Sequence, residues 1–315
     1  MPTILKNKGA QPNMVLNKSF LGFLNNLKNR YLLDKNVTLI HCPNFSFQSF
    51  NPEVAKHKGY YSYPPTGLQC LKAALTELDY SVDIFDMNYI LLKKICHHDP
   101  EEPLNVSVLL DEYFEAHEAS IVGVSAGEVV SDIFDVKNHP FIQTLEYLRE
   151  KNKHLVLAGG VIATNEWKNL LRKNLVHFAF RGESENKVIS LIRHLEGESG
   201  AHATSGIHFK YNGQYEETVG EKDVVNFNWD IISTYKDICI EDYHNVGCLS
   251  PFSRMIGTEK TYTTLQLNRG CRAHCTFCGV TPFMGLGVRQ YPVDAVINEL
   301  IYLVRERGVQ HFEWL

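Results

Sequence analysis

The sequence predicts an α/β protein built on a doubly wound, Rossmann-like parallel sheet, followed by a smaller α/β part at the C-terminal end. Short apolar segments alternate with segments of helical periodicity between residues 36 and 200, as in a parallel sheet covered by helices on both faces. A second observation is a further strand that leads directly into a group of three cysteines. The composition, with 44% hydrophobic and 21% charged residues, is that of a globular chain long enough for two domains.

Residues 1–35 are predicted to form an N-terminal helical extension. Apolar side chains recur at helical spacing from Leu16 to Tyr31, and we expect this helix to pack on the domain that follows rather than on a membrane. No apolar run reaches the length of a membrane span, and no export signal is apparent, so we expect a cytoplasmic protein. The net charge of −5 gives no sign of the excess of basic residues with which proteins bind nucleic acid, so no nucleic-acid partner is expected.

Residues 36–200 are predicted to form the doubly wound domain. Its first strand ends at Cys42-Pro43-Asn44, and a helix opens with Pro64-Pro65-Thr66-Gly67. Because ligands bind where the strands of such a sheet end, the residues at those ends are candidate binding positions. These positions are Asn44, Ser125, Gly159, Gly160, Gly182 and Glu183. The predicted strands cover residues 37–41, 81–85, 121–124, 155–158 and 178–180, and the predicted helices cover 68–78, 141–149, 167–171 and 185–195.

Residues 201–258 are interpreted as a connector, and residues 259–315 as the start of a second domain. Within the connector, residues 206–218 are predicted to form a hairpin that turns at Asn212-Gly213. The second domain is predicted to contain strands at 261–267 and 310–314 and a helix at 293–305.

The cysteine loop has the spacing C-x3-C-x2-C, formed by Cys271, Cys275 and Cys278. Three thiolates on one tight loop can hold three irons of a [4Fe–4S] cube and leave the fourth iron open to a substrate that chelates it. A zinc site is the alternative, but it normally needs four closed ligands. His274 is a poor fourth ligand because its neighbour Cys275 is itself a ligand. We therefore expect an iron–sulfur cluster.

The segment Asn268-Arg-Gly-Cys-Arg-Ala-His-Cys-Thr-Phe-Cys278 resembles the signature of the radical S-adenosylmethionine (SAM) superfamily. This resemblance implies that SAM binds the open iron through its amino and carboxylate groups. It also implies that an electron from the reduced cluster splits SAM to release a 5′-deoxyadenosyl radical. Phe277 matches the aromatic position whose backbone lies near the adenine of SAM in that family.

The first domain is similar to the cobalamin-binding domains that precede the cluster domain in many radical SAM enzymes. The similarity lies in five segments that follow one another in the expected order. They are Tyr63-Pro-Pro-Thr-Gly-Leu68, Tyr80-Ser-Val-Asp-Ile-Phe-Asp86, Gly123-Val-Ser125, Ala158-Gly-Gly160 and Arg181-Gly-Glu183. The resemblance implies that cobalamin contacts Asn44, Pro65, Gly67, Ser125, Gly159, Gly160, Gly182 and Glu183. Gly159 and Gly160 would let the nucleotide tail approach the backbone closely, Ser125 offers a hydroxyl, and Glu183 offers a hydrogen-bond acceptor.

The sequence departs from the cobalamin domains that supply a histidine to cobalt. Those domains carry Asp-x-His-x-x-Gly after the first strand, whereas this chain has Cys42-Pro-Asn-Phe-Ser-Phe-Gln48 there. The pattern does occur at Asp242-Tyr-His-Asn-Val-Gly247, far away in the connector, and we interpret that copy as a coincidence. Cobalamin is therefore expected to bind without a protein histidine on cobalt. His41 adjoins the first loop, and its position in the strand fits a structural role as well as ligation.

The predicted function is that of a cobalamin-dependent radical SAM enzyme. By the resemblance, methyl transfer to an unactivated carbon of a small molecule or peptide is expected, with flavodoxin or ferredoxin as electron donor. One alternative is a non-catalytic cobalamin-binding module with a vestigial cluster loop. A second is a methylthiotransferase-like enzyme with another cluster on Cys42, Cys70 and Cys96, although Cys70 falls among apolar residues of a helix.

The predicted second domain resembles the beginning of a radical SAM partial (β/α) barrel. One βα unit takes about 30 residues, since eight units take about 250. Residues 261–315 have room for one unit and a second strand, so the barrel is expected to be truncated and SAM binding to be weakened.

Overall fold

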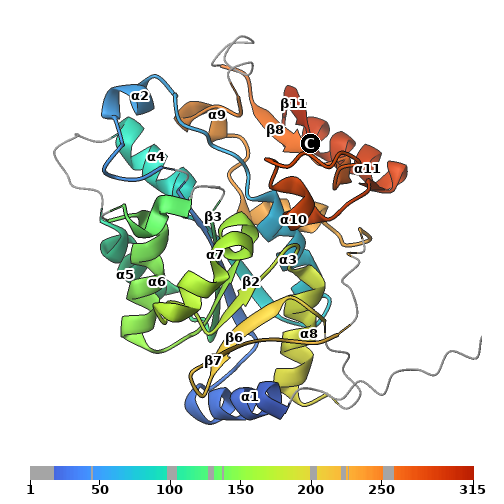
Figure 1. Ribbon diagram of the computed structural model, residues 1–315. Coiled ribbons are helices and arrows are strands. Elements are labelled where there is room, and N and C mark those ends of the chain that lie inside the picture. Colours follow the sequence, from blue (N-terminus) through green and yellow to red (C-terminus); the bar gives the residue numbers. More distant parts are fainter. Residues whose placement is uncertain are drawn as a thin grey trace, which may run out of the picture.

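A computed structural model describes most of the chain, and its largest unit is a seven-stranded sheet (Figure 1). The strands lie in the order β2-β1-β3-β4-β5-β6-β7, with β1 to β5 parallel and with β6 and β7 antiparallel. The predicted doubly wound sheet is confirmed, and the predicted hairpin extends it beyond residue 200. The strands are β1 (Asn36–Cys42), β2 (Ser81–Asp86), β3 (Ile121–Ala126), β4 (Leu155–Gly159), β5 (Phe178–Phe180), β6 (Ile207–Tyr211) and β7 (Gln214–Glu217). The described residues are 18–43, 45–97, 105–126, 131–136, 138–198, 204–220, 225, 227–250 and 259–315.

Helices cover both faces of this sheet (Figure 1). Successive side chains of a strand point to opposite faces, so Leu39 packs in the core beneath α1, α3 and α8, and Ile40 packs in the core beneath α5, α6 and α7. Alternation of this kind explains why the strands are apolar on both sides. The helices are α1 (Lys18–Arg30), α3 (Thr66–Thr76), α5 (Val106–Ala116), α6 (Pro140–Lys151), α7 (Gly160–Arg172) and α8 (Glu185–Glu196).

Helix α1 packs on the sheet, as its periodicity predicts. The ring of Phe20 is 1% exposed and lies 6.3 Å from the ring of Phe178 and 5.5 Å from that of Phe209. Leu24 and Leu27 are buried beside it. The apolar face of this helix is therefore buried in the protein's own core.

The strand order reverses between β1 and β3: the chain continues from β1 to β2 on one side of this boundary and from β3 to β4 and β5 on the other. In an open α/β sheet, a crevice forms outside the carboxyl ends of the strands at such a point. The register aligns Asp86, His41, Ser125 and Gly159 across β2, β1, β3 and β4 at this edge. These strand ends form the floor of the candidate site.

The cysteine-bearing part contains one βα unit and a second strand, as predicted. β8 (Tyr262–Leu265) pairs in parallel with β11 (His311–Trp314), and α11 (Val293–Arg305) connects them. The cysteine loop is closed by a short antiparallel pair, and it contains a short helix. These elements are β9 (Asn268–Arg269), β10 (Arg289–Gln290) and α10 (Val280–Met284).

Several helices were not predicted from the sequence. Asn105 caps α5 by accepting a hydrogen bond from the backbone N–H of Ser107 at 2.9 Å, and α4 follows β2 without a loop. The remaining helices are α2 (Pro52–Lys56), α4 (Met87–His97) and α9 (Tyr243–Val246), with 3₁₀ turns η1 (Ser131–Phe134) and η2 (Ile232–Asp237). No helix within the described ranges is both long enough and apolar enough to cross a membrane.

A buried histidine lies between α7 and β6. The ring of His208 is 1% exposed and stacks on the indole of Trp167, with ring centroids 4.0 Å apart. Neither ring nitrogen has a hydrogen-bond partner among the described residues. Burial, together with the charges of Arg181 and Lys168, lowers the pKa of His208 to about 4.

This pKa predicts an acid-sensitive contribution to stability. The folded pKa lies below the ordinary value of 6.5, so the fold favours the neutral ring and loses stability as the pH falls below 6.5. Between about pH 7 and about pH 5 we expect the free energy of unfolding to fall by about 2 kcal/mol from this residue alone. Urea unfolding of wild type and His208→Phe at both pH values measures it. An equal pH dependence in the two proteins would contradict the prediction.

Candidate functional site

A cavity of about 330 Å³ lies between the sheet, α3 and α8. Its inner walls are apolar, with Leu39 and Leu157 from the sheet, Leu71 from α3 and Val188 from α8. The remaining wall comes from the cysteine-bearing part. The residues of that wall are Thr264, Gln266, Arg269, Phe283, Met284 and Leu315. The cavity therefore lies at the junction of the two parts of the chain.

Most of the predicted cobalamin positions line this cavity. Gly182 is not among the lining residues, and Asn44 lies outside the described residues. The residues that the structure brings together on the wall are Pro65, Gly67, Ser125, Gly159, Gly160 and Glu183. They come from four separate regions of the chain, and the carboxyl edge of the sheet gathers them.

Glycine is needed at these positions for different structural reasons. Gly160 has φ of +82°, and a Cβ there would lie 2.7 Å from the Ser125 hydroxyl oxygen. Gly182 has φ of +79°, and a Cβ there would lie 3.0 Å from the carbonyl oxygen of Phe283. Gly182 therefore lets β5 approach α10 closely. A Cβ on Gly67 would meet no atom within 4 Å, so this glycine leaves space free.

His41 lines the cavity and pairs with Asp86, which is not among the lining residues. Nδ1 of His41 lies 3.0 Å from a carboxylate oxygen of Asp86, its neighbour in the strand register. The Tyr243 hydroxyl and the Tyr89 backbone N–H both donate to the same carboxylate. The carboxylate thus fixes the orientation of the imidazole. The sequence signal for this pair is that His41 ends the first predicted strand and Asp86 follows the second, and the structure aligns the two strand ends.

The second copy of the histidine pattern lies elsewhere. His244 is on α9 and is not among the residues that line the cavity. Burial acts against ionisation of Asp242, yet hydrogen bonds from Lys93 and Tyr89 lower its pKa to about 2. Asp242 is therefore a structural anion that ties α9 to α4, which supports the interpretation of this pattern as a coincidence.

The cysteine loop is exposed, and its thiols are not paired in disulfides. Cys275 is exposed, and Cys271 and Cys278 are half-buried. The side chain of Phe277 is 91% exposed, so its ring is hardly covered by the rest of the protein. Within the described part of the chain, no group of three or more His, Cys, Asp or Glu side chains is arranged to hold a metal. The fit to an iron–sulfur cluster therefore depends on the donor set, which is three free thiols on one short loop.

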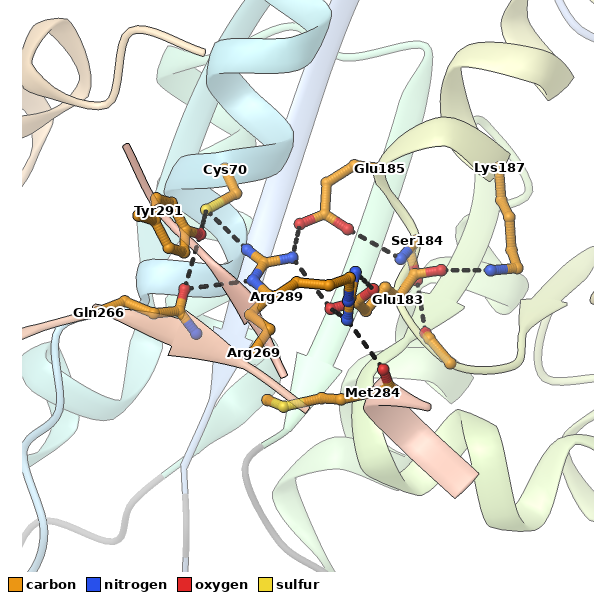
Figure 2. A network of polar contacts seen from close by, with 11 residues as sticks. Cys70, Glu183, Ser184, Glu185, Lys187, Gln266, Arg269, Met284, Arg289 and Tyr291 are labelled. Atoms are coloured by element: carbon orange, nitrogen blue, oxygen red, sulfur yellow. Dashed lines mark hydrogen bonds and ion pairs between the residues drawn. The ribbon is translucent and has the colours of Figure 1, made fainter. Parts of the chain in front are cut away.

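A network of charges joins the cavity wall to the base of the cysteine loop (Figure 2). Glu183 accepts hydrogen bonds from Arg289 at 2.7 and 2.8 Å and lies 3.5 Å from Arg269. Glu185 pairs with Arg269 at 2.5 Å, and both of these side chains are about 5% exposed. Burial disfavours the charged guanidinium, but the carboxylate of Glu185 raises the pKa of Arg269 above its ordinary value. No local sequence pattern indicates this network, and from the sequence Glu183 was expected to contact only the ligand.

The other cysteines do not come together. Cys70 lies 3.1 Å from a guanidinium nitrogen of Arg269, and burial raises the pKa of its thiol to about 11. Cys42 instead contacts Thr144 at 3.7 Å, and Cys96 contacts the carbonyl oxygen of Ala55 at 3.5 Å. These separate environments give no support to a second cluster of the methylthiotransferase type.

Solved structures of two proteins share this architecture. The radical SAM methyltransferase TsrM from Kitasatospora setae, solved with cobalamin and a [4Fe–4S] cluster bound, aligns over 90% of this chain and 48% of its own, at a TM-score of 0.57 and 15% identity. The cobalamin-dependent SAM radical enzyme OxsB, solved with aqua-cobalamin bound, aligns over 89% of this chain and 33% of its own, at a TM-score of 0.58 and 14% identity. The chain shares the fold of the aligned parts of these two proteins.

Two enzymes are similar to this chain in sequence. The anaerobic magnesium-protoporphyrin IX monomethyl ester cyclase of Synechocystis sp. is 25% identical over 263 residues, which are 79% of this chain and 44% of the cyclase. The cytidylyl-2-hydroxyethylphosphonate methyltransferase of Streptomyces wedmorensis is 44% identical over 48 residues, which are 15% of this chain and 9% of that enzyme. The chain thus spans less than half the length of each relative. No family model matches the sequence.

Proposed function

We propose that this chain is part of a cobalamin-dependent radical SAM enzyme. In this proposal cobalamin occupies the cavity, and Cys271, Cys275 and Cys278 hold a [4Fe–4S] cluster that binds SAM. The observation that carries the proposal is the convergence on one cavity wall of six residues that the sequence analysis assigned to cobalamin. The other wall of the same cavity belongs to the part that carries the cysteines.

The cavity residues have the chemistry that a corrinoid with a nucleotide tail requires. Leu39, Leu71 and Leu157 form an apolar slot suited to an aromatic base, because the contact removes apolar surface from water. The absence of a side chain at Gly67 leaves room for the tail, and the Ser125 hydroxyl offers a polar contact at the strand ends. In the proposal, residues 36–200 are the cobalamin-binding domain, residues 1–35 and 201–258 are its extension and connector, and residues 259–315 begin the radical SAM domain.

The cysteine loop supplies the second half of the site. The three thiolates would bind iron, and the backbone of the exposed Phe277 would lie near the adenine of SAM. When bound, the reduced cluster and SAM supply radical chemistry, and cobalamin supplies a methyl group. We propose methyl transfer to an unactivated carbon of a small molecule or peptide, with flavodoxin or ferredoxin as electron donor.

Anaerobic reconstitution of the full chain with iron, sulfide and hydroxocobalamin tests this proposal. After desalting, we expect about one cobalt per chain and a visible spectrum that contains both corrinoid bands and the broad absorption of an iron–sulfur cluster. His244→Ala is the matched control, since His244 lies outside the cavity, and we expect its spectrum and cobalt content to be unchanged. Loss of all cobalt from wild-type protein on desalting would count against cobalamin binding.

The enzyme is distinguished from a non-catalytic module by the fate of SAM. Reduction of the loaded protein with dithionite, followed by measurement of 5′-deoxyadenosine, gives the answer. Formation of 5′-deoxyadenosine by protein that holds both cofactors supports the enzyme over the binding module.

A further inference from the structure

One carboxylate ties both ends of the cysteine loop to the wall of the cavity. Glu183 forms a two-point ion pair with Arg289, which follows the loop, and also lies 3.5 Å from Arg269, which precedes it (Figure 2). Arg289 in addition donates a hydrogen bond to the carbonyl oxygen of Met284 at 2.8 Å. The last residue of α10 is thereby held to the same anchor.

The anchor is a balanced group of charges in which Glu185 and Arg269 are buried, Glu183 is nearly buried and Arg289 is half-buried. The Glu183 side chain is 10% exposed and the Arg269 side chain 5%, so water screens their charges poorly. Glu185 provides the second carboxylate, so that two carboxylates face two guanidinium groups. A planar two-point ion pair is satisfied in one geometry only. The loop base therefore has one preferred placement relative to α8.

The same residues face the cavity. Glu183, Glu185, Arg269 and Met284 all line it. A ligand that fills the cavity replaces water next to these ion pairs and strengthens them, because their attraction grows as the surroundings become less polar. Filling the cavity therefore favours the loop placement in which the ion pairs are formed.

We propose that Glu183 is a positioning residue that couples cobalamin binding in the cavity to cluster binding on the cysteine loop. The proposal rests on the proposed function and adds to it a thermodynamic link between the two cofactors. Because such a link is reciprocal, loading the cluster must raise the affinity for cobalamin by the same factor as cobalamin raises the affinity of the loop for the cluster.

The coupling is measured by titrating hydroxocobalamin into the full chain with and without a reconstituted cluster. In wild type we expect cobalamin to bind about 5- to 10-fold more tightly to the cluster-loaded protein. In Glu183→Gln the shape of the side chain remains but the charge is lost, and we expect this factor to fall to about 1. Arg289→Gln removes the same two-point ion pair from the other side and should behave alike, so the test survives if one variant fails to fold.

A spectroscopic readout separates positioning from general stability. Adding cobalamin should change the electron paramagnetic resonance signal of the reduced cluster in wild type and leave it unchanged in Glu183→Gln. Glu198→Gln is the matched control, because Glu198 forms an exposed ion pair with Arg193 and does not line the cavity, and it should keep the wild-type coupling. The proposal is overturned if the cluster changes the affinity of the wild type for cobalamin by a factor near 1. It is also overturned if this factor is undiminished in Glu183→Gln and Arg289→Gln. A wild type that binds no cobalamin in either state overturns the proposed function instead.

Discussion

Replacing Cys271, Cys275 and Cys278 together by alanine is expected to abolish iron binding. Anaerobically reconstituted wild-type protein should hold about four irons per chain, and the triple variant should hold almost none, because no other group on the loop can replace three thiolates. The side chains are exposed or half-buried, so their removal should change the free energy of unfolding little. Iron analysis and the visible spectrum measure the effect.

Two single variants control for the other thiols. Cys239→Ala removes an exposed thiol outside the loop, and Cys70→Ala removes the buried thiol beside Arg269. Both variants should load iron as wild type does. Stoichiometric zinc in place of iron in the wild-type protein would show that the loop is a zinc site.

Replacing Gly67 by tryptophan is expected to weaken cobalamin binding at least about 100-fold, or about 3 kcal/mol. A Cβ at Gly67 meets no atom within 4 Å, and the residue lines the cavity, so the indole enters space that the ligand needs. The fold should tolerate the change because Gly67 has ordinary backbone angles in α3. Gly160 is a poorer position for this experiment, since its φ of +82° makes any side chain strained.

The graded control is Gly67→Ala. A methyl group takes up little of the cavity, and we expect its affinity for hydroxocobalamin to lie within about threefold of wild type. Equilibrium titration of the three proteins gives the comparison. Wild-type affinity in Gly67→Trp would mean that cobalamin binds elsewhere.

The positions at the strand ends could be predicted because local patterns determine them. Alternating strands and helices impose a parallel sheet, and such a sheet brings the ends of its strands to one edge. Ser125, Gly159 and Gly160 therefore line one cavity although only their local sequences were used. The hairpin that turns at Asn212-Gly213 was predicted for the same local reason, but its pairing with β5 was not.

The charge network could not be predicted in this way. Glu183 and Arg289 are 106 residues apart, and Glu185 and Arg269 are 84 apart, so nothing in either local sequence specifies the pairing. Only the docking of the cysteine-bearing part against α8 brings them together. The same docking explains Gly182, whose missing side chain admits the carbonyl group of Phe283 rather than lining the cavity.

Diffraction from crystals of the loaded full chain, with anomalous data collected at the cobalt and iron absorption edges, tests the central claim most directly. We predict a cobalt peak in the cavity, between the carboxyl ends of the strands and the wall that carries Gln266 and Met284, and iron peaks at the three cysteines of the loop. A cobalt peak remote from these residues, or an empty cavity in crystals that hold cobalt, would contradict the assignment of the cavity to cobalamin.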